Sequence, residues 1–294
     1  MRDGQILYTP FVDAVGDVTL FTVNPDGTHA RQAYPYAMEC PHWSPDGRQV
    51  ASCGTPGGDG TTILDIDTGH TRLLPFLAPG LFSPCFVWSP DGSRLACEGA
   101  TDEGTQNGIY TVRVRDWGDV RKVTSIPGGD DHPGGFSPDG RRLEFVRFTD
   151  PDTGPGALYV VNTNGSGLRK ITPDWLNVRS EGDWSPRGNE IVFSARTQDD
   201  LRQQLWMVRS DGSDLRTITV AADPPCGGLS ADQASVGCTG PTWSPTGDRI
   251  AFRRNSATGI ELVTSCPDGS HVAHVADEGS DAGDADWGVH PLAR

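Results

Sequence analysis

A short motif recurs along the chain and constrains its fold more than any other feature. The motif is an aromatic residue, a Ser-Pro pair, a turn ending in Gly and then an alternating apolar run, as in WSPDGRQVAS. Most copies are about 45 residues apart, within the range of propeller blades. The anchoring aromatics are Trp43, Trp88, Phe136, Trp184, Trp243 and, in a decayed copy, Trp287.

A second pattern recurs in phase with the first. In each repeat two short apolar runs flank a Gly turn, as in LYVVNTNGSGLRKIT. Pairs such as Asn164-Gly165 accept positive φ and close tight hairpins. The flanking runs are rich in Val, Ile, Leu, Thr and Tyr and alternate with polar residues, as half-buried strands do. Each repeat therefore predicts four strands, and no segment has sustained helical periodicity.

These repeats predict an all-β fold, a six-bladed β-propeller of four-stranded blades. The chain begins with GQILYTP, which has the character of a second strand without a first, and Trp287 marks a first strand without a second. We therefore expect the N-terminal strand to pair with the Trp287 strand and close the ring. Residues 1–294 then form a single domain.

The charge balance narrows the classes of partner. The formal net charge is −15, which disfavours nucleic acid because its phosphates are repelled. No apolar run is long enough to insert into a membrane, and the start of the chain lacks the regions of a signal peptide. We expect a periplasmic or secreted protein whose presequence is not part of this sequence, with a cytoplasmic protein as the alternative.

The cysteine count is seven, and their positions suggest different roles. Cys226 and Cys238 flank the insertion before Trp243, where a disulfide stabilises a loop with little other support in an oxidising compartment. Four others are expected to be buried thiols in the core, with a bridge or a shared metal between the two that precede their aromatics as the alternative. These four are Cys40, Cys53, Cys85 and Cys97.

The WSPDG turn, followed by Arg, one residue and an apolar-Ala pair, resembles the repeat of the TolB propeller and its WD-like relatives over essentially the whole chain. TolB is periplasmic and works through protein contacts, so the resemblance implies a binding role. Related propellers cap prolyl-peptidase-type hydrolases, but this chain has no G-x-S-x-G motif. Some oligosaccharide lyases with similar repeats hold a metal through channel histidines, which implies an enzymatic alternative.

Segments that lead into the first strands carry polar residues, which a propeller gathers around one axis. These segments include MECPHW, GGDDHPGGF, RSEGDW and GDADW. Loops at this face of a propeller vary while the scaffold stays fixed, so ligands are expected here. The candidate ligand-binding residues are Glu39, His42, Asp130, Asp131, His132, Trp175, Arg179, Glu181, Asp183, Asp284 and Asp286.

Three of these residues, His42, Asp183 and Asp286, immediately precede the Trp of their repeat. An imidazole and two carboxylates around one axis suit a divalent cation such as Ca²⁺, Mn²⁺ or Mg²⁺. With His132 they are also the candidate catalytic groups, because neighbouring carboxylates push their pKa values apart. The alternative is that they hydrogen-bond to channel-facing backbone and have no catalytic role.

The chain is therefore expected to be a non-catalytic, monomeric module that binds a protein or a glycan at an acidic channel mouth. The alternative is a metal-assisted polysaccharide lyase or hydrolase that uses His42, His132, Asp183 and Asp286. A purely structural propeller within a larger assembly is the third interpretation.

Overall fold

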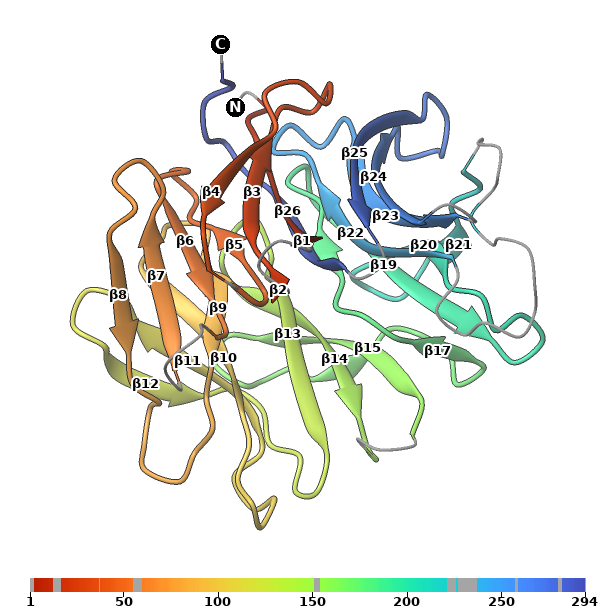
Figure 1. Ribbon diagram of the computed structural model, residues 1–294. Coiled ribbons are helices and arrows are strands. Elements are labelled where there is room, and N and C mark those ends of the chain that lie inside the picture. The colour runs from red at the N-terminus through yellow and green to blue at the C-terminus, as the bar shows by residue number, and fades with distance from the viewer. Residues whose placement is uncertain are drawn as a thin grey trace.

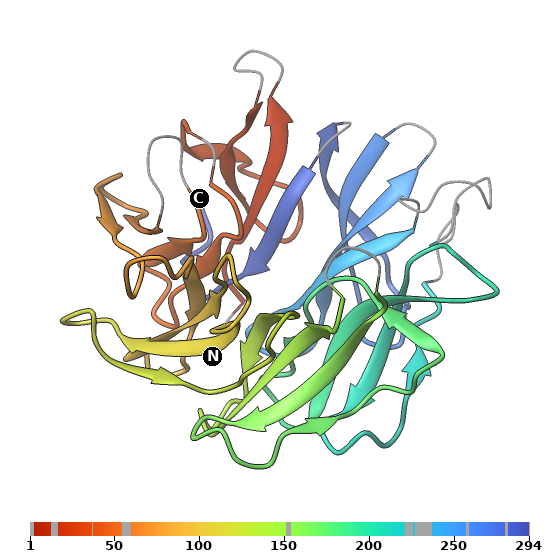
Figure 2. The same cartoon turned by 90° about the horizontal axis from the view of Figure 1, so that it is seen from below.

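The computed structural model has an all-β fold, as the repeats predict (Figure 1). It describes residues 3–12, 17–36, 38–54, 60–150, 154–220, 226, 237–256, 259–279 and 282–293, without the side chains of 11, 12, 17, 18, 256 and 282–284. Within these residues there is no helix, and accordingly none that is suited to crossing a membrane. Seen from below, the sheets are arranged radially around a common centre (Figure 2).

Three of the sheets are four-stranded antiparallel meanders. The first consists of β5 (His42–Trp43), β6 (Gln49–Ser52), β7 (Thr61–Asp65) and β8 (Thr71–Leu74). The second consists of β9 (Cys85–Trp88), β10 (Arg94–Gly99), β11 (Gly108–Arg113) and β12 (Gly118–Lys122). The third consists of β22 (Cys238–Trp243), β23 (Ile250–Ser256), β24 (Gly259–Ser265) and β25 (Ala273–Gly279).

A nine-stranded sheet contains two further meanders. Their strands are β13 (Asp130–Phe136), β14 (Arg142–Phe148), β15 (Gly156–Asn162), β16 (Arg169–Lys170), β18 (Asp183–Trp184), β19 (Glu190–Thr197), β20 (Gln204–Arg209) and β21 (Arg216–Thr217). The extra strand β17 (Leu176–Val178) joins them by pairing with β15 and β19. Leu176 and Val178 are both buried, so this unpredicted strand is held by its apolar side chains.

The last sheet contains both ends of the chain. Its strands are β26 (Ala282–Trp287), β1 (Ile6–Val12), β2 (Asp17–Val18), β3 (Leu20–Val23) and β4 (Arg31–Tyr34). Strand β26 pairs with β1 in the register Ile6↔Trp287, and the Trp287 indole donates to the Gly4 carbonyl at 3.0 Å. The N-terminal strand therefore pairs with the Trp287 strand.

The Ser-Pro-Asp-Gly sequence explains the turn between each first and second strand. In the first copy the Ser44 hydroxyl donates to Asp46 at 2.6 Å and accepts from the Gln49 N–H at 2.9 Å. Gly47 adopts φ +69°, a conformation that a Cβ would strain. The same hydrogen bonds recur at Ser89 and Ser137.

The core lies between neighbouring sheets. The strands that carry the anchoring aromatics contact one another in succession, from β5 to β9, β13, β18, β22 and β26, and β26 contacts β5. The Trp88 indole donates to the His42 carbonyl of the preceding sheet at 3.2 Å. Phe145, Phe193 and Phe252 occupy corresponding second-strand positions and are fully buried. Aromatic and aliphatic side chains thus fix the spacing of the sheets.

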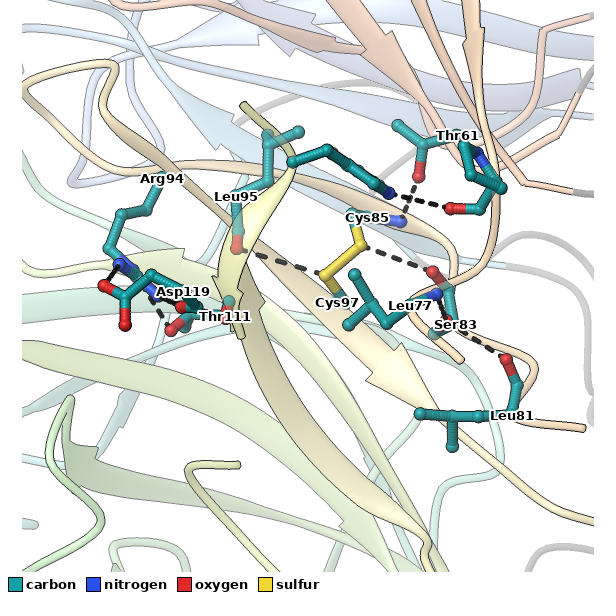
Figure 3. Close-up of a disulfide and its surroundings, with 12 residues drawn as sticks. Thr61, Leu77, Leu81, Ser83, Cys85, Arg94, Leu95, Cys97, Thr111 and Asp119 are labelled. Carbon is teal, nitrogen blue, oxygen red and sulfur yellow. Dashed lines mark hydrogen bonds and ion pairs between the residues drawn. A yellow bond between two sulfur atoms is a disulfide. The ribbon is translucent and has the colours of Figure 1, made fainter. Parts of the chain in front are cut away.

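The structure contains three disulfides, which join Cys40 to Cys53, Cys85 to Cys97 and Cys226 to Cys238. The expectation that the first four of these cysteines are buried thiols is wrong. Cys40, just before β5, is bonded to Cys53, just after β6, with Cα atoms 5.5 Å apart, and Cys85 on β9 is bonded to Cys97 on β10, with Cα atoms 3.9 Å apart. Figure 3 shows the second of these bonds in its core surroundings. Cys266 is the free cysteine.

Candidate functional site

A cavity of about 190 Å³ lies where segments leading into several first strands converge. Small residues such as Gly134, Gly182 and Gly240 form part of its wall. Its polar side chains are His42, Glu98, His132, Ser180, Glu181, Asp183, Thr242 and Asp286. The fold therefore brings together five of the predicted site residues, together with Glu98 and Thr242, which sequence reasoning missed.

His132 contacts two carboxyl groups in this cavity. Its Nδ1 lies 3.6 Å from Glu98 Oε2 on β10 and 3.5 Å from Glu181 Oε1, which precedes β18. Burial opposes protonation of the ring, but Glu181, Glu98 and Asp130 outweigh it and raise the pKa of His132 to about 9. The imidazolium therefore persists at neutral pH and bridges two carboxylates.

The pKa values of the two carboxyls move in opposite directions. Burial raises the pKa of Glu98, although the positive charge of His132 opposes the rise. Burial also acts to raise the pKa of Glu181, but the hydrogen bond and the charge of His132 outweigh it and lower that pKa. Glu181 is thus ionised at neutral pH, and 43% of its side chain is exposed at the cavity.

Asp183 and Asp286 connect neighbouring first strands. Asp183 Oδ2 accepts from the Trp243 N–H at 2.6 Å, and Asp286 Oδ2 accepts from the Trp43 N–H at 2.7 Å. The Thr242 hydroxyl lies between the two carboxylates, 3.1 Å from Asp183 Oδ2 and 3.3 Å from Asp286 Oδ1. One oxygen of each carboxylate is therefore held by the backbone of the next sheet.

The third member of the predicted metal set is His42, whose Nδ1 lies 3.9 Å from Asp286 Oδ2. Its ring stacks on Phe86, with the ring centroids 5.6 Å apart. Across the described part of the chain, no three His, Cys, Asp or Glu side chains converge closely enough to hold a metal ion. In this structure Asp183 and Asp286 accept hydrogen bonds, and His42 packs against Phe86.

A buried carboxyl, that of Glu144, lies behind the cavity wall. Its side chain is fully buried, and neither oxygen has a hydrogen-bond partner of standard geometry among the described residues. Burial, together with the charges of Asp183 and Glu181, raises its pKa well above the usual range, which the Gly182 N–H only partly offsets. Burial also raises the pKa of Asp183 to about 7, against the opposing Trp243 N–H. The buried position of Glu144 thus favours the protonated form of its carboxyl.

The buried Glu144 side chain accounts for a glycine in GGDDHPGGF. A Cβ on Gly134 would lie 1.9 Å from Glu144 Oε1, so a glycine here makes room for that carboxyl. Sequence reasoning did not select Glu144, although a signal was present. The equivalent second-strand position holds Ala51, Ala96, Val192 or Ala251 in other repeats.

Other candidate residues lie away from the cavity lining. Asp131 is buried and accepts two hydrogen bonds of 2.7 Å from Arg147, so it anchors β13 to β14. Glu39 and Arg179 are exposed. Trp175 is 50% exposed and packs edge-on against Trp206, 5.8 Å between ring centroids.

Two candidates remain. Asp130 lies at the start of β13 and accepts from the Asn107 amide at 3.4 Å, and its charge contributes to the raised pKa of His132. The side chain of Asp284 lies outside the described residues.

A second cavity of about 340 Å³ is lined by all six anchoring aromatics and by prolines of the Ser-Pro turns. His42, Asp183 and Asp286 line both cavities, whereas Glu98, His132 and Glu181 line the first alone, and we call this first cavity the charged channel mouth.

Comparison with known proteins adds a family and a fold. A family model described as the TolB beta propeller domain matches residues 16–290. No curated protein sequence matches the chain. Among solved structures, TolB from Acinetobacter baumannii superposes with a TM-score of 0.73 at 18% identity, covering 97% of this chain and 66% of that protein.

Two further solved structures are similar. A putative TolB from Agrobacterium tumefaciens has a TM-score of 0.68 at 21% identity, with 94% of this chain and 90% of that one covered. An oligogalacturonate lyase in complex with manganese has a TM-score of 0.58 at 13% identity, with 88% and 71% covered. At these identities the likeness concerns the fold alone.

Proposed function

Because the chain belongs to the TolB β-propeller family, we propose that it is a non-catalytic binding module whose protein or glycan ligand docks at the charged channel mouth. One observation carries this proposal. The carboxylates best placed for catalysis, Asp183 and Asp286, are engaged by the backbone N–H groups of Trp243 and Trp43. A carboxylate held in this way stabilises the junction of two sheets and is poorly suited to move as an acid or base.

The groups left for a ligand are those around His132. Glu181 presents a half-exposed carboxylate, and His42 and His132 keep about 30% of their side chains exposed. These groups combine hydrogen-bond acceptors with donors in a small concave site, which suits hydroxyl groups of a glycan or amides of a peptide.

The proposal includes an architecture and a compartment. Six anchor strands in successive contact, together with the β1–β26 pairing, support a six-bladed, single-domain, closed ring. Three disulfides support an oxidising compartment, hence a periplasmic or secreted protein.

A binding screen tests the function. The protein is screened against a random-peptide display library and an array of neutral and acidic oligosaccharides, and each binder is retested on Glu181→Gln and His132→Gln. We expect both variants to lose at least about tenfold in affinity, as the loss of a charged hydrogen bond does. His274→Gln is the control, because His274 is half-exposed on β25, away from the cavity lining, and pairs with Asp277. Binders that do not distinguish these variants would overturn the proposal.

The alternative is a metal-assisted carbohydrate-active enzyme using His42, His132, Asp183 and Asp286. This alternative is supported by the pKa of about 7 of Asp183, whose carboxyl lines the same cavity as the charged His132. Elemental mass spectrometry before and after dialysis against a chelator, with the same oligosaccharides assayed for cleavage, tests it. One bound divalent ion per chain and cleavage that His132→Ala abolishes would replace the binding proposal with this one.

A further inference from the structure

A third cavity lies outside the channel, between the β9–β12 meander and the β13–β16 meander. Its volume is about 420 Å³, and its lining includes Asp91, Arg94, Phe136, Asp139 and Thr163. Phe136 is the only anchoring aromatic that is not Trp. The cavity therefore coincides with the one departure from the aromatic pattern of the repeat.

At the next boundary along the chain the corresponding space is filled. The Arg142 guanidinium lies over the Trp184 ring, 4.7 Å from its centroid, and donates to the Ser210 hydroxyl at 3.0 Å. Cation–π stacking and a charged hydrogen bond thus hold an arginine of one sheet against the next sheet.

The two boundaries are equivalent residue by residue. Arg94 and Arg142 each follow their own aromatic by the same spacing in WSPDGSR and FSPDGRR. The Thr163 N–H donates to the Arg141 carbonyl as the Ser210 N–H donates to the Asn189 carbonyl. Phe136 and Thr163 therefore stand where Trp184 and Ser210 stand, and both line the cavity.

Arg94 does not occupy this space. It turns back onto its own sheet, donating to Thr111 Oγ1 at 3.2 Å and to Asp119 Oδ2 at 2.9 Å (Figure 3). Phe attracts a guanidinium less strongly than Trp does, which favours the carboxylate partner. Arg249 turns back similarly, onto Thr264, but there the next anchor is the larger Trp287.

We propose that this cavity binds the guanidinium group of an arginine side chain presented by a partner protein. The Phe136 ring supplies the stacking face, and the Thr163 hydroxyl, which donates weakly to the Arg141 carbonyl, keeps lone pairs to accept. Asp91 and Asp139 supply negative charge. Arg94 and Arg121 also line the cavity, but both are paired with Asp119. This inference does not depend on the channel site.

The carboxyl groups of Asp91 and Asp139 carry the negative charge that a guanidinium needs. Hydrogen bonds from Ser93 and Ser89 lower the pKa of Asp91, and those from Ser137 and Arg141 lower the pKa of Asp139. Both are therefore ionised at neutral pH, and each accepts these hydrogen bonds through Oδ1. None of these hydrogen bonds goes to Oδ2 of either carboxylate, which leaves Oδ2 to accept from a guanidinium.

Titration with capped amino acids, followed by amide NMR spectra of the whole protein, tests the proposal. N-acetyl-arginine amide is expected to give saturable shifts at Phe136 and Thr163. N-acetyl-citrulline amide, which keeps the shape without the charge, and N-acetyl-lysine amide, which keeps the charge without the plane, are each expected to bind at least about tenfold more weakly. Equal binding of citrulline, or no saturable shift at these residues, would overturn the proposal.

Variants at the two boundaries between sheets test whether the guanidinium binds in the proposed cavity. Thr163→Val is expected to weaken binding by about tenfold, whereas Ser210→Ala, the matched change at the filled boundary, leaves it unchanged. Arg142→Ala empties the second space and is expected to raise the stoichiometry from one to two, with new shifts at Trp184 and Ser210. Unchanged stoichiometry in a folded Arg142→Ala protein would show that the space does not select guanidinium.

Discussion

The carboxyl group of Glu144 lies against the backbone of Gly134 and Gly182, and a side chain on Gly134 would meet it at 1.9 Å. We predict that Gly134→Ala lowers the free energy of unfolding by about 1–3 kcal/mol, the usual cost of overpacking. Urea denaturation measures it. Gly54→Ala is the control, because its nearest contact would be an ordinary 3.4 Å to the exposed Glu39.

A double variant separates the clash from other effects. In a Glu144→Ala background the cost of Gly134→Ala should shrink but not vanish, because the Gly182 carbonyl also lies 2.7 Å from the added Cβ. Equal costs in both backgrounds would mean that the glycine is not there to accommodate Glu144.

His132 should make the stability of the folded protein depend on pH. Its pKa rises from 6.5 to about 9 in the folded chain, so the folded state binds the proton more tightly than the unfolded state. The stabilisation is complete below pH 6.5 and is lost as the pH rises through about 9, by at most about 3 kcal/mol. We predict that His132→Gln removes this decline, measured by chemical denaturation at intervals between pH 6 and 10. Parallel curves for the two proteins would contradict the assignment.

The disulfides are expected to stabilise the fold by closing short loops. Each closes a loop of 12 or 13 residues, which stabilises a fold by on the order of 3 kcal/mol in the chain-entropy model. We predict that the double change Cys85→Ser with Cys97→Ser lowers the unfolding free energy by about that amount, measured by urea denaturation without reductant. Cys266→Ser is the matched control and should leave stability unchanged.

Thiol labelling gives an independent check. The unreduced, unfolded chain should take up one alkyl group, at Cys266, and the reduced chain should take up seven, the full cysteine count. More than one label without reductant would show that a disulfide is missing.

The sequence predicted the strand elements well where local chemistry decides them. The Ser-Pro-Asp-Gly turns, the anchoring aromatics and the Gly hairpins all depend on neighbouring residues, and the all-β fold followed from them. The pairing of Cys85 with Cys97 depends instead on cross-strand register, which here includes an irregularity between Ala96 and Cys97. Strand β17 likewise depends on contacts with distant strands, which no local pattern encodes.

The candidate site, too, could be predicted only as far as the local sequence pattern decides it. The repeat predicted that His42, His132, Glu181, Asp183 and Asp286 converge, and they line one cavity. It did not predict which side chains of DDHPGGF face that cavity, because a run with two glycines and a proline gives little strand signal. Strand β13 covers that run, and its alternation turns Asp131 toward Arg147 while His132 faces the cavity.

The whole molecule depends on the junction of its two ends. Strands β1 and β26 pair, the Gln5 N–H donates to the His290 carbonyl at 2.9 Å, and the His290 ring stacks on Trp43 of another sheet, with the ring centroids 5.1 Å apart. Deleting residues 282–294 therefore exposes one edge of β1 and unpacks the Trp43 sheet. We predict that this deletion abolishes cooperative thermal unfolding, measured by circular dichroism and calorimetry.

A circular permutant distinguishes loss of the junction from mere loss of sequence order. Residues 3 and 293 are joined by a Gly-Ser linker of about ten residues, and new ends are opened in the exposed turn between Glu103 and Gly104. All strand pairings are kept, so the permutant should unfold cooperatively near the temperature of the parent, as chain connectivity matters less than contacts. If the deletion variant unfolds as the parent does, the ends are a dispensable appendage, and the closed ring that we propose is wrong.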